Sequence, residues 1–74
     1  MPNYIVNRNA QPNGDNEVHQ YPRWNCTSPD YPAVHNQVQL GYFAACSGAV
    51  SEAKRLGYSK ANGCFYCANA CHTS

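Results

Sequence analysis

The chain has few aliphatic and phenylalanine side chains for its length. Ile, Leu, Val and Phe together account for ten of the 74 residues, whereas a self-supporting globular core uses roughly a fifth or more. Charged residues are also scarce: five basic and four acidic side chains leave a formal net charge of +1. Disorder in so lean a sequence goes with a large net charge, so disorder is disfavoured. We therefore expect residues 1–74 to form a single small domain that something besides apolar burial stabilises.

Long hydrophobic runs are absent. The most apolar stretch, residues 38–50, contains Gln39, Ser47 and two glycines and is shorter than the ~20 residues of a membrane span. The first six residues show no basic segment, no apolar run and no cleavage site of a secretory leader. We accordingly expect a complete, cytoplasmic chain that does not enter a membrane. In a reducing compartment cysteines stay as thiols and bind metal more often than they pair.

Basic clusters are also missing. Only Lys54, Arg55 and Lys60 lie near one another in the sequence, whereas tight binding to a phosphate backbone draws on several basic side chains acting together. Nucleic-acid binding should therefore be weak. The six tyrosines substitute for missing aliphatic residues and also suit a contact surface for protein. A protein is thus the expected partner.

Residues 3–21 have the pattern of a β-hairpin. Strand-like segments at residues 3–8 and 17–21 flank a polar stretch that contains Asn13-Gly14, and Asn-Gly readily supplies the positive φ of a reversing turn. The proline-containing residues 22–37 are expected to form an irregular loop with at most one helical turn.

The second half of the chain predicts one further strand and one helix. Val38, Leu40 and Tyr42 alternate with other residues, as in a strand with one buried face. Apolar residues at helical spacing follow at Ala49, Val50, Ala53 and Leu56. Ser47 is the expected N-cap and Gly57 the stop, and residues 59–63 are expected to form a turn. The predicted fold class is α+β: a zinc-stapled domain with a short antiparallel β-sheet and one main helix.

The five cysteines and three histidines carry the chemistry of this chain. Cys64 and Cys67 form a C-x2-C pair after Asn62-Gly63, and in such a knuckle both thiolates can approach one ion at ~2.3 Å, the usual Zn–S distance. A structural zinc ion needs two more ligands. The candidates are His19, Cys26, His35, Cys46, Cys71 and His72. His19 and Cys26 would give a pair in the N-terminal half that faces Cys64 and Cys67 and joins both ends of the chain through Zn2+.

Several of these features resemble the small zinc-binding domain related to the metal site of the Ada DNA-repair protein. They are Tyr4-Ile5 and Asn7, then His19 and Cys26, Tyr42-Phe43, Gly57-Tyr58, and finally Cys64-x2-Cys67. The resemblance implies a ligand set of one histidine and three cysteines, which falls on His19, Cys26, Cys64 and Cys67. Phe65 and Tyr66 stand where that family commonly has Lys and Arg, so its methyl-accepting chemistry is not carried over.

Four candidate residues remain outside this ligand set, and one of them, His35, is expected to be solvated in the proline-containing loop. Cys46, Cys71 and His72 can form a second cluster near the helix start or a disulfide, or Cys46 can join Cys26, Cys64 and Cys67 in a cysteine-only set. The four acidic residues show no paired spacing for acid–base catalysis, and a four-ligand zinc leaves no position for water. We therefore predict a non-catalytic binding module. The competing hypotheses are a disulfide-stapled exported protein and a thiol-active redox protein with Cys46 as its reactive group.

Overall fold

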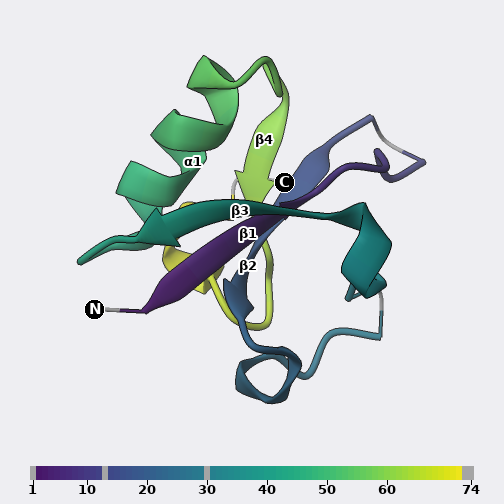
Figure 1. Cartoon of the computed structure of the whole chain (residues 1–74), viewed down its shortest axis with the longest axis vertical. Helices are drawn as coiled ribbons and strands as arrows, with labels where there is room; N and C mark the ends of the chain where they lie inside the picture. Colours follow the sequence, from purple (N-terminus) through teal and green to yellow (C-terminus); the bar gives the residue numbers. More distant parts are fainter. Residues whose placement is uncertain (1, 13, 30, 73–74) are drawn as a thin grey trace.

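A computed structural model of the chain describes residues 2–12, 14–29 and 31–72. Four strands form one mixed sheet in the order β3-β1-β2-β4, and the helix α1 packs beside it (Figure 1). The strands are β1 (Asn3–Asn7), β2 (Asn16–Tyr21), β3 (Gln37–Tyr42) and β4 (Ala61–Gly63), and α1 spans Cys46–Arg55. Three single turns of 3-10 helix add to these: η1 (Arg23–Asn25), η2 (Val34–Asn36) and η3 (Asn69–Cys71). The predicted α+β class with one main helix is confirmed.

The β1–β2 pair is the one that the sequence predicts. β1 and β2 form the expected antiparallel hairpin, in which Ile5 lies opposite His19 and Val6 opposite Val18. β3 pairs antiparallel with the other edge of β1. β4 differs from the prediction, because residues 61–63 were expected in a turn, yet they pair with β2 in the parallel direction. The sheet is therefore mixed rather than antiparallel throughout.

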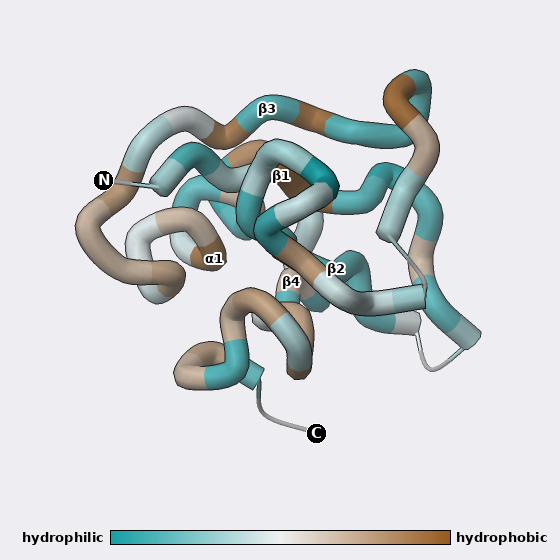
Figure 2. The backbone as a smooth tube through the Cα atoms, turned by 90° about the horizontal axis from the view of Figure 1, so that it is seen from below, coloured by the Kyte–Doolittle hydropathy of each residue, from teal (hydrophilic) through white to brown (hydrophobic). Residues whose placement is uncertain are grey.

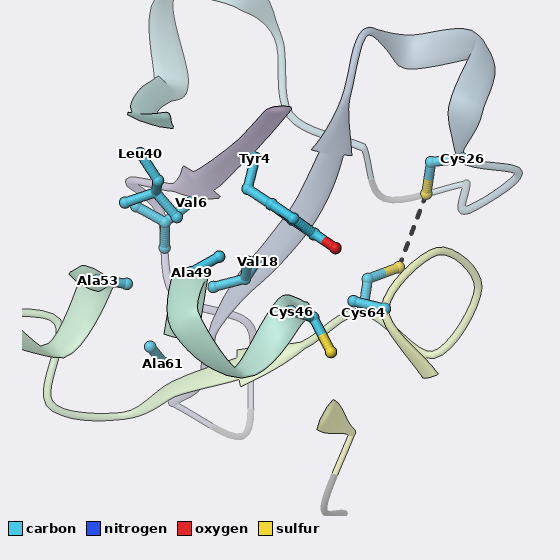
Figure 3. Close-up of a cluster of buried hydrophobic side chains, with 11 residues drawn as sticks. Tyr4, Val6, Val18, Cys26, Leu40, Cys46, Ala49, Ala53, Ala61 and Cys64 are labelled. Atoms are coloured by element: carbon cyan, nitrogen blue, oxygen red, sulfur yellow. Dashed lines mark hydrogen bonds between the residues drawn. The ribbon is translucent and has the colours of Figure 1, made fainter. Parts of the chain in front are cut away.

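The core lies between one face of this sheet and α1. Val6, Val18 and Leu40 point from the strands toward Ala49 and Ala53 of the helix, and Tyr4 points from β1 toward the side where Cys64 lies (Figure 3). The two alanines are fully buried, and their small side chains let the helix approach the sheet closely. Hydrophobic segments of the chain are short and interrupted by hydrophilic ones along the backbone (Figure 2). The core therefore contains few large apolar side chains, as the composition predicts.

The ends of α1 correct one prediction and confirm another. The helix begins at Cys46, with Ala45 in the N-cap position and no side-chain cap, so Ser47 lies inside the first turn and the predicted N-cap is wrong. Gly57 ends the helix as predicted: its φ is +109°, its N–H donates to Lys54 O, and the N–H of Tyr58 donates to Ala53 O. These two hydrogen bonds define a Schellman motif, which needs a left-handed residue that glycine adopts without strain.

The loop between β2 and β3 is irregular, as the prolines predict, but it contains two single turns of 3-10 helix instead of one. None of the helices within the described residues has the length and apolar character needed to cross a membrane.

Candidate metal centre

The first two predicted ligands come from β2 and the loop that follows it. His19 lies on β2 and is fully buried. Cys26 follows η1 and is 4% exposed. Its N–H donates to Arg23 O at 3.0 Å, and Arg23 Nη1 donates back to Cys26 O at 2.8 Å. These two hydrogen bonds hold the loop in the turn that brings Cys26 to the His19 side chain.

The other two predicted ligands lie on a turn at the end of β4. The N–H of Cys64 continues the pairing with β2 by donating to Val18 O at 2.9 Å. The chain then turns back, and the N–H of Ala68 donates to Cys64 O at 2.9 Å. Cys67, within this turn, receives the N–H of Gln20 on its sulfur at 3.2 Å. Strand β2 therefore contacts both cysteines of the C-x2-C pair.

Gly63 permits the close packing behind this turn. A Cβ built at this position would lie 2.6 Å from Ala68 O and 2.6 Å from the Cβ of Cys71. Backbone atoms cannot give way to such a contact cheaply, so only glycine fits directly before Cys64. The Asn62-Gly63 pair, which the sequence suggests as a turn, in fact serves this close approach.

The four predicted ligands lie together. One donor atom from each of His19, Cys26, Cys64 and Cys67 falls within 4.8 Å of the others, so the group can hold a metal ion. The Sγ atoms of Cys26 and Cys64 are 3.7 Å apart, as the dashed line in Figure 3 marks. His19 Nδ1 lies 3.7 Å from Cys26 Sγ and 3.8 Å from Cys67 Sγ.

These distances match the edges of a metal-centred tetrahedron. Two sulfurs bound to one zinc ion at ~2.3 Å with tetrahedral angles are about 3.8 Å apart, and a sulfur and a nitrogen are about 3.6 Å apart. The observed separations are within a few tenths of an ångström of these values. The separation of the Cys26 and Cys64 sulfurs is also far too long for an S–S bond, and Cys26, Cys64 and Cys67 are all free cysteines.

Protonation of the three thiols differs because each has different neighbours. The Cys67 thiol donates a hydrogen bond that lowers the pKa of Cys64 to about 3, with further help from His19 and backbone N–H groups against the opposing effect of burial. The same hydrogen bond, together with burial, raises the pKa of Cys67. Burial also raises the pKa of Cys26. One thiolate and two thiols are thus favoured without a cation, and a bound divalent cation would displace the remaining protons.

Cys46 and Cys71 form a disulfide that joins the start of α1 to η3. Of the three arrangements that the sequence leaves open, the structure thus has the disulfide. The cysteine-only ligand set and a reactive Cys46 thiol are both wrong, because the Cys46 sulfur is bonded to Cys71. His72 donates through Nδ1 to Gly63 O at 3.0 Å, and His35 is exposed in η2 as predicted.

Glu17 is a further neighbour of the site and was not among the predicted site residues. Its Oε1 lies 3.4 Å from His19 Nε2, and both side chains are buried. The signal was present in the sequence, because residues two apart on a strand point to the same face of the sheet. Glu17 was considered only as a catalytic acid, for which it has no carboxylate partner.

Comparison with models of known protein families, with characterised proteins and with solved structures finds no match for this chain.

Proposed function

We propose that this protein is a non-catalytic, structural zinc-binding module. His19, Cys26, Cys64 and Cys67 would hold the ion. The observation that carries the proposal is the spacing of their four donor atoms, which fits a tetrahedral shell of three sulfurs and one nitrogen. A donor set rich in thiolates with this geometry favours zinc over oxygen-seeking cations such as magnesium and calcium. The ligand order also agrees with the resemblance to the Ada-type domain, a relationship that we likewise put forward as a proposal.

A structural rather than catalytic role follows from the number and burial of the ligands. Four protein donors complete the coordination of zinc and leave no position for a reactive water. Cys26 and Cys64 are almost completely buried, and His19 is fully so. The ion would connect β2, the loop after it and the turn after β4.

The surface near the metal centre supports a protein partner. Trp24, which is 84% exposed, lies two residues before Cys26, and the exposed Phe65 and Tyr66 lie between Cys64 and Cys67. Exposed aromatic side chains are enriched at protein interfaces. The net charge of +1 gives little attraction for a phosphate backbone, so we propose protein binding with at most weak affinity for nucleic acid.

The redox state of Cys46 and Cys71 bears on the compartment in which the protein works. The sequence predicts a cytoplasmic protein, in which these two residues would be thiols, whereas disulfides are typical of oxidising compartments. The zinc proposal applies in both cases, because neither sulfur belongs to the ligand set.

Titration with Co2+ tests this function. Cobalt should saturate at one ion per chain with the strong visible absorption of a tetrahedral thiolate site, and one equivalent of zinc should displace it. Cys67→Ser should lose much of the thiolate charge-transfer band. The matched control is Cys46→Ala with Cys71→Ala, which should keep the full spectrum. The weak visible absorption of octahedral cobalt would contradict the proposed ligand set. Loss of the tetrahedral spectrum in the control variant would also contradict it.

A further inference from the structure

The two ring nitrogens of His19 face different groups. Nδ1 points at the sulfurs of Cys26 and Cys67, 3.7 and 3.8 Å away. Nε2 lies on the opposite side of the ring, buried, with no hydrogen bond of good geometry within the described residues. If Nδ1 binds a metal ion through its lone pair, the ring proton must be on Nε2. That N–H then needs an acceptor inside the protein.

Glu17 is placed to be that acceptor. Its Oε1 lies 3.4 Å from Nε2, slightly longer than a normal N–H···O distance. Glu17 and His19 are two residues apart on β2, so both side chains leave the same face of the sheet. Glu17 is only 9% exposed. The Nε2–H of a metal-bound His19 would give this buried carboxylate a hydrogen bond at its Oε1 atom.

We infer that Glu17 is a positioning residue for the metal centre: its carboxylate accepts the Nε2–H of His19, fixes the tautomer in which Nδ1 is free to bind the ion, and sets the ring orientation. A carboxylate behind a metal-bound histidine also makes the imidazole a stronger ligand. The inference rests on the proposed zinc site and deepens it, because it names the residue outside the ligand set on which the site depends.

Other neighbouring groups also restrict the orientation of the His19 ring. The ring of Tyr31 packs against His19 with centroids 5.0 Å apart, and the Tyr31 hydroxyl donates to Gln20 O at 2.9 Å. The guanidinium of Arg23 lies over the Tyr31 ring, 5.0 Å from the centroid of that ring. This positive charge also offsets part of the negative charge that three thiolates and the Glu17 carboxylate would bring to the zinc-loaded site.

The experiment compares zinc affinity in two Glu17 variants and one control. Glu17→Gln keeps the shape and an acceptor oxygen but removes the charge, and Glu17→Leu removes both. Competition with a chromophoric chelator should show zinc affinity about 10-fold lower in Glu17→Gln and up to about 100-fold lower in Glu17→Leu. Glu52→Gln, which changes a partly exposed carboxylate paired with Arg55 on α1, should bind zinc like the unmodified chain.

Nitrogen-15 NMR of the His19 ring supplies a readout that general destabilisation would not change. In the zinc-loaded protein, Nδ1 should have the shift of a metal-bound nitrogen, and the Nε2 proton should exchange slowly with water. Glu17→Gln should bind zinc with this ring proton exchanging faster. Unchanged affinity and unchanged exchange in zinc-loaded Glu17→Gln would overturn the role of Glu17 while leaving the zinc site in place. Failure of the unmodified chain to bind zinc would overturn the proposed function itself.

Discussion

Replacing Cys64 with serine should abolish the cooperative unfolding transition of this protein. The Cys64 sulfur is fully buried and lies 3.7 Å from Cys26 Sγ, and a serine hydroxyl is a poor ligand for zinc at neutral pH. Zinc binding to a structural site contributes ~10–16 kcal/mol of apparent free energy, whereas a whole domain is stable by only about 5–15 kcal/mol. With ten aliphatic and phenylalanine residues in the chain, the remaining core cannot replace that contribution.

The disulfide should not rescue this variant. The Cys46–Cys71 bond closes a loop within the second half of the chain and leaves β1 and β2 outside it. Circular dichroism during denaturation and the amide spectrum check the expectation. The matched control is His72→Ala, which removes one hydrogen bond to Gly63 O and should cost about 1 kcal/mol or less. A well-dispersed amide spectrum with a sharp transition in Cys64→Ser would show that the metal is dispensable for folding.

Removing the disulfide should destabilise the zinc-loaded protein by about 3–4 kcal/mol without releasing the ion. The estimate follows from the loop-closure entropy of a crosslink between residues separated by 25 positions. Cys46→Ala with Cys71→Ala is the variant to measure, because the two alanines leave no unpaired thiol. Urea titration in the presence of zinc gives the free energy of unfolding, and a chelator competition gives the zinc affinity.

The disulfide and the proposed zinc site connect different segments of the chain. The disulfide fixes α1 against η3, and η3 packs against Gly63 behind the candidate metal centre, whereas the proposed zinc site would join β2 to the turn after β4. If Cys46→Ala with Cys71→Ala lost as much zinc affinity as a ligand variant does, zinc binding would depend on the disulfide. A loss of stability below about 1 kcal/mol would mean that the disulfide constrains nothing that the metal does not already hold.

The sequence predicts those parts of the fold that depend on local patterns. The β-branched residues of two short segments, with Gly14 between them at a φ of +92°, indicate the β1–β2 hairpin, and the helical spacing that ends at Gly57 indicates α1. Asn13, the other residue of the expected turn, lies outside the described residues. Strand β4 was missed because Ala61–Gly63 has neither the length nor the composition of a strand. It is extended only because its backbone pairs with β2, and that pairing depends on the position of the whole chain after α1.

In the candidate site, too, some features follow from local sequence patterns and others depend on the whole fold. The C-x2-C pair is a local signal. His19 and Cys26 were proposed because they would face that pair from the N-terminal half of the chain, and because the family resemblance implies them. The partner of Cys46 could not be derived, because residues 25 positions apart meet only after α1 has folded against the sheet. The role proposed for Glu17 also depends on which His19 nitrogen faces the sulfurs, which no sequence pattern specifies.

The central claim is that one zinc ion bound by His19, Cys26, Cys64 and Cys67 holds this chain in its folded state. Native mass spectrometry of the protein, purified without added metal or chelator, tests it most directly. The account predicts one zinc ion per folded chain together with the loss of two hydrogens at Cys46 and Cys71, and a shift to highly charged, unfolded ions when a chelator removes the zinc. A metal-free mass with the compact charge distribution of a folded protein would contradict it. So would a metal-free mass that lacks four hydrogens, because that mass requires a second disulfide in place of the ion.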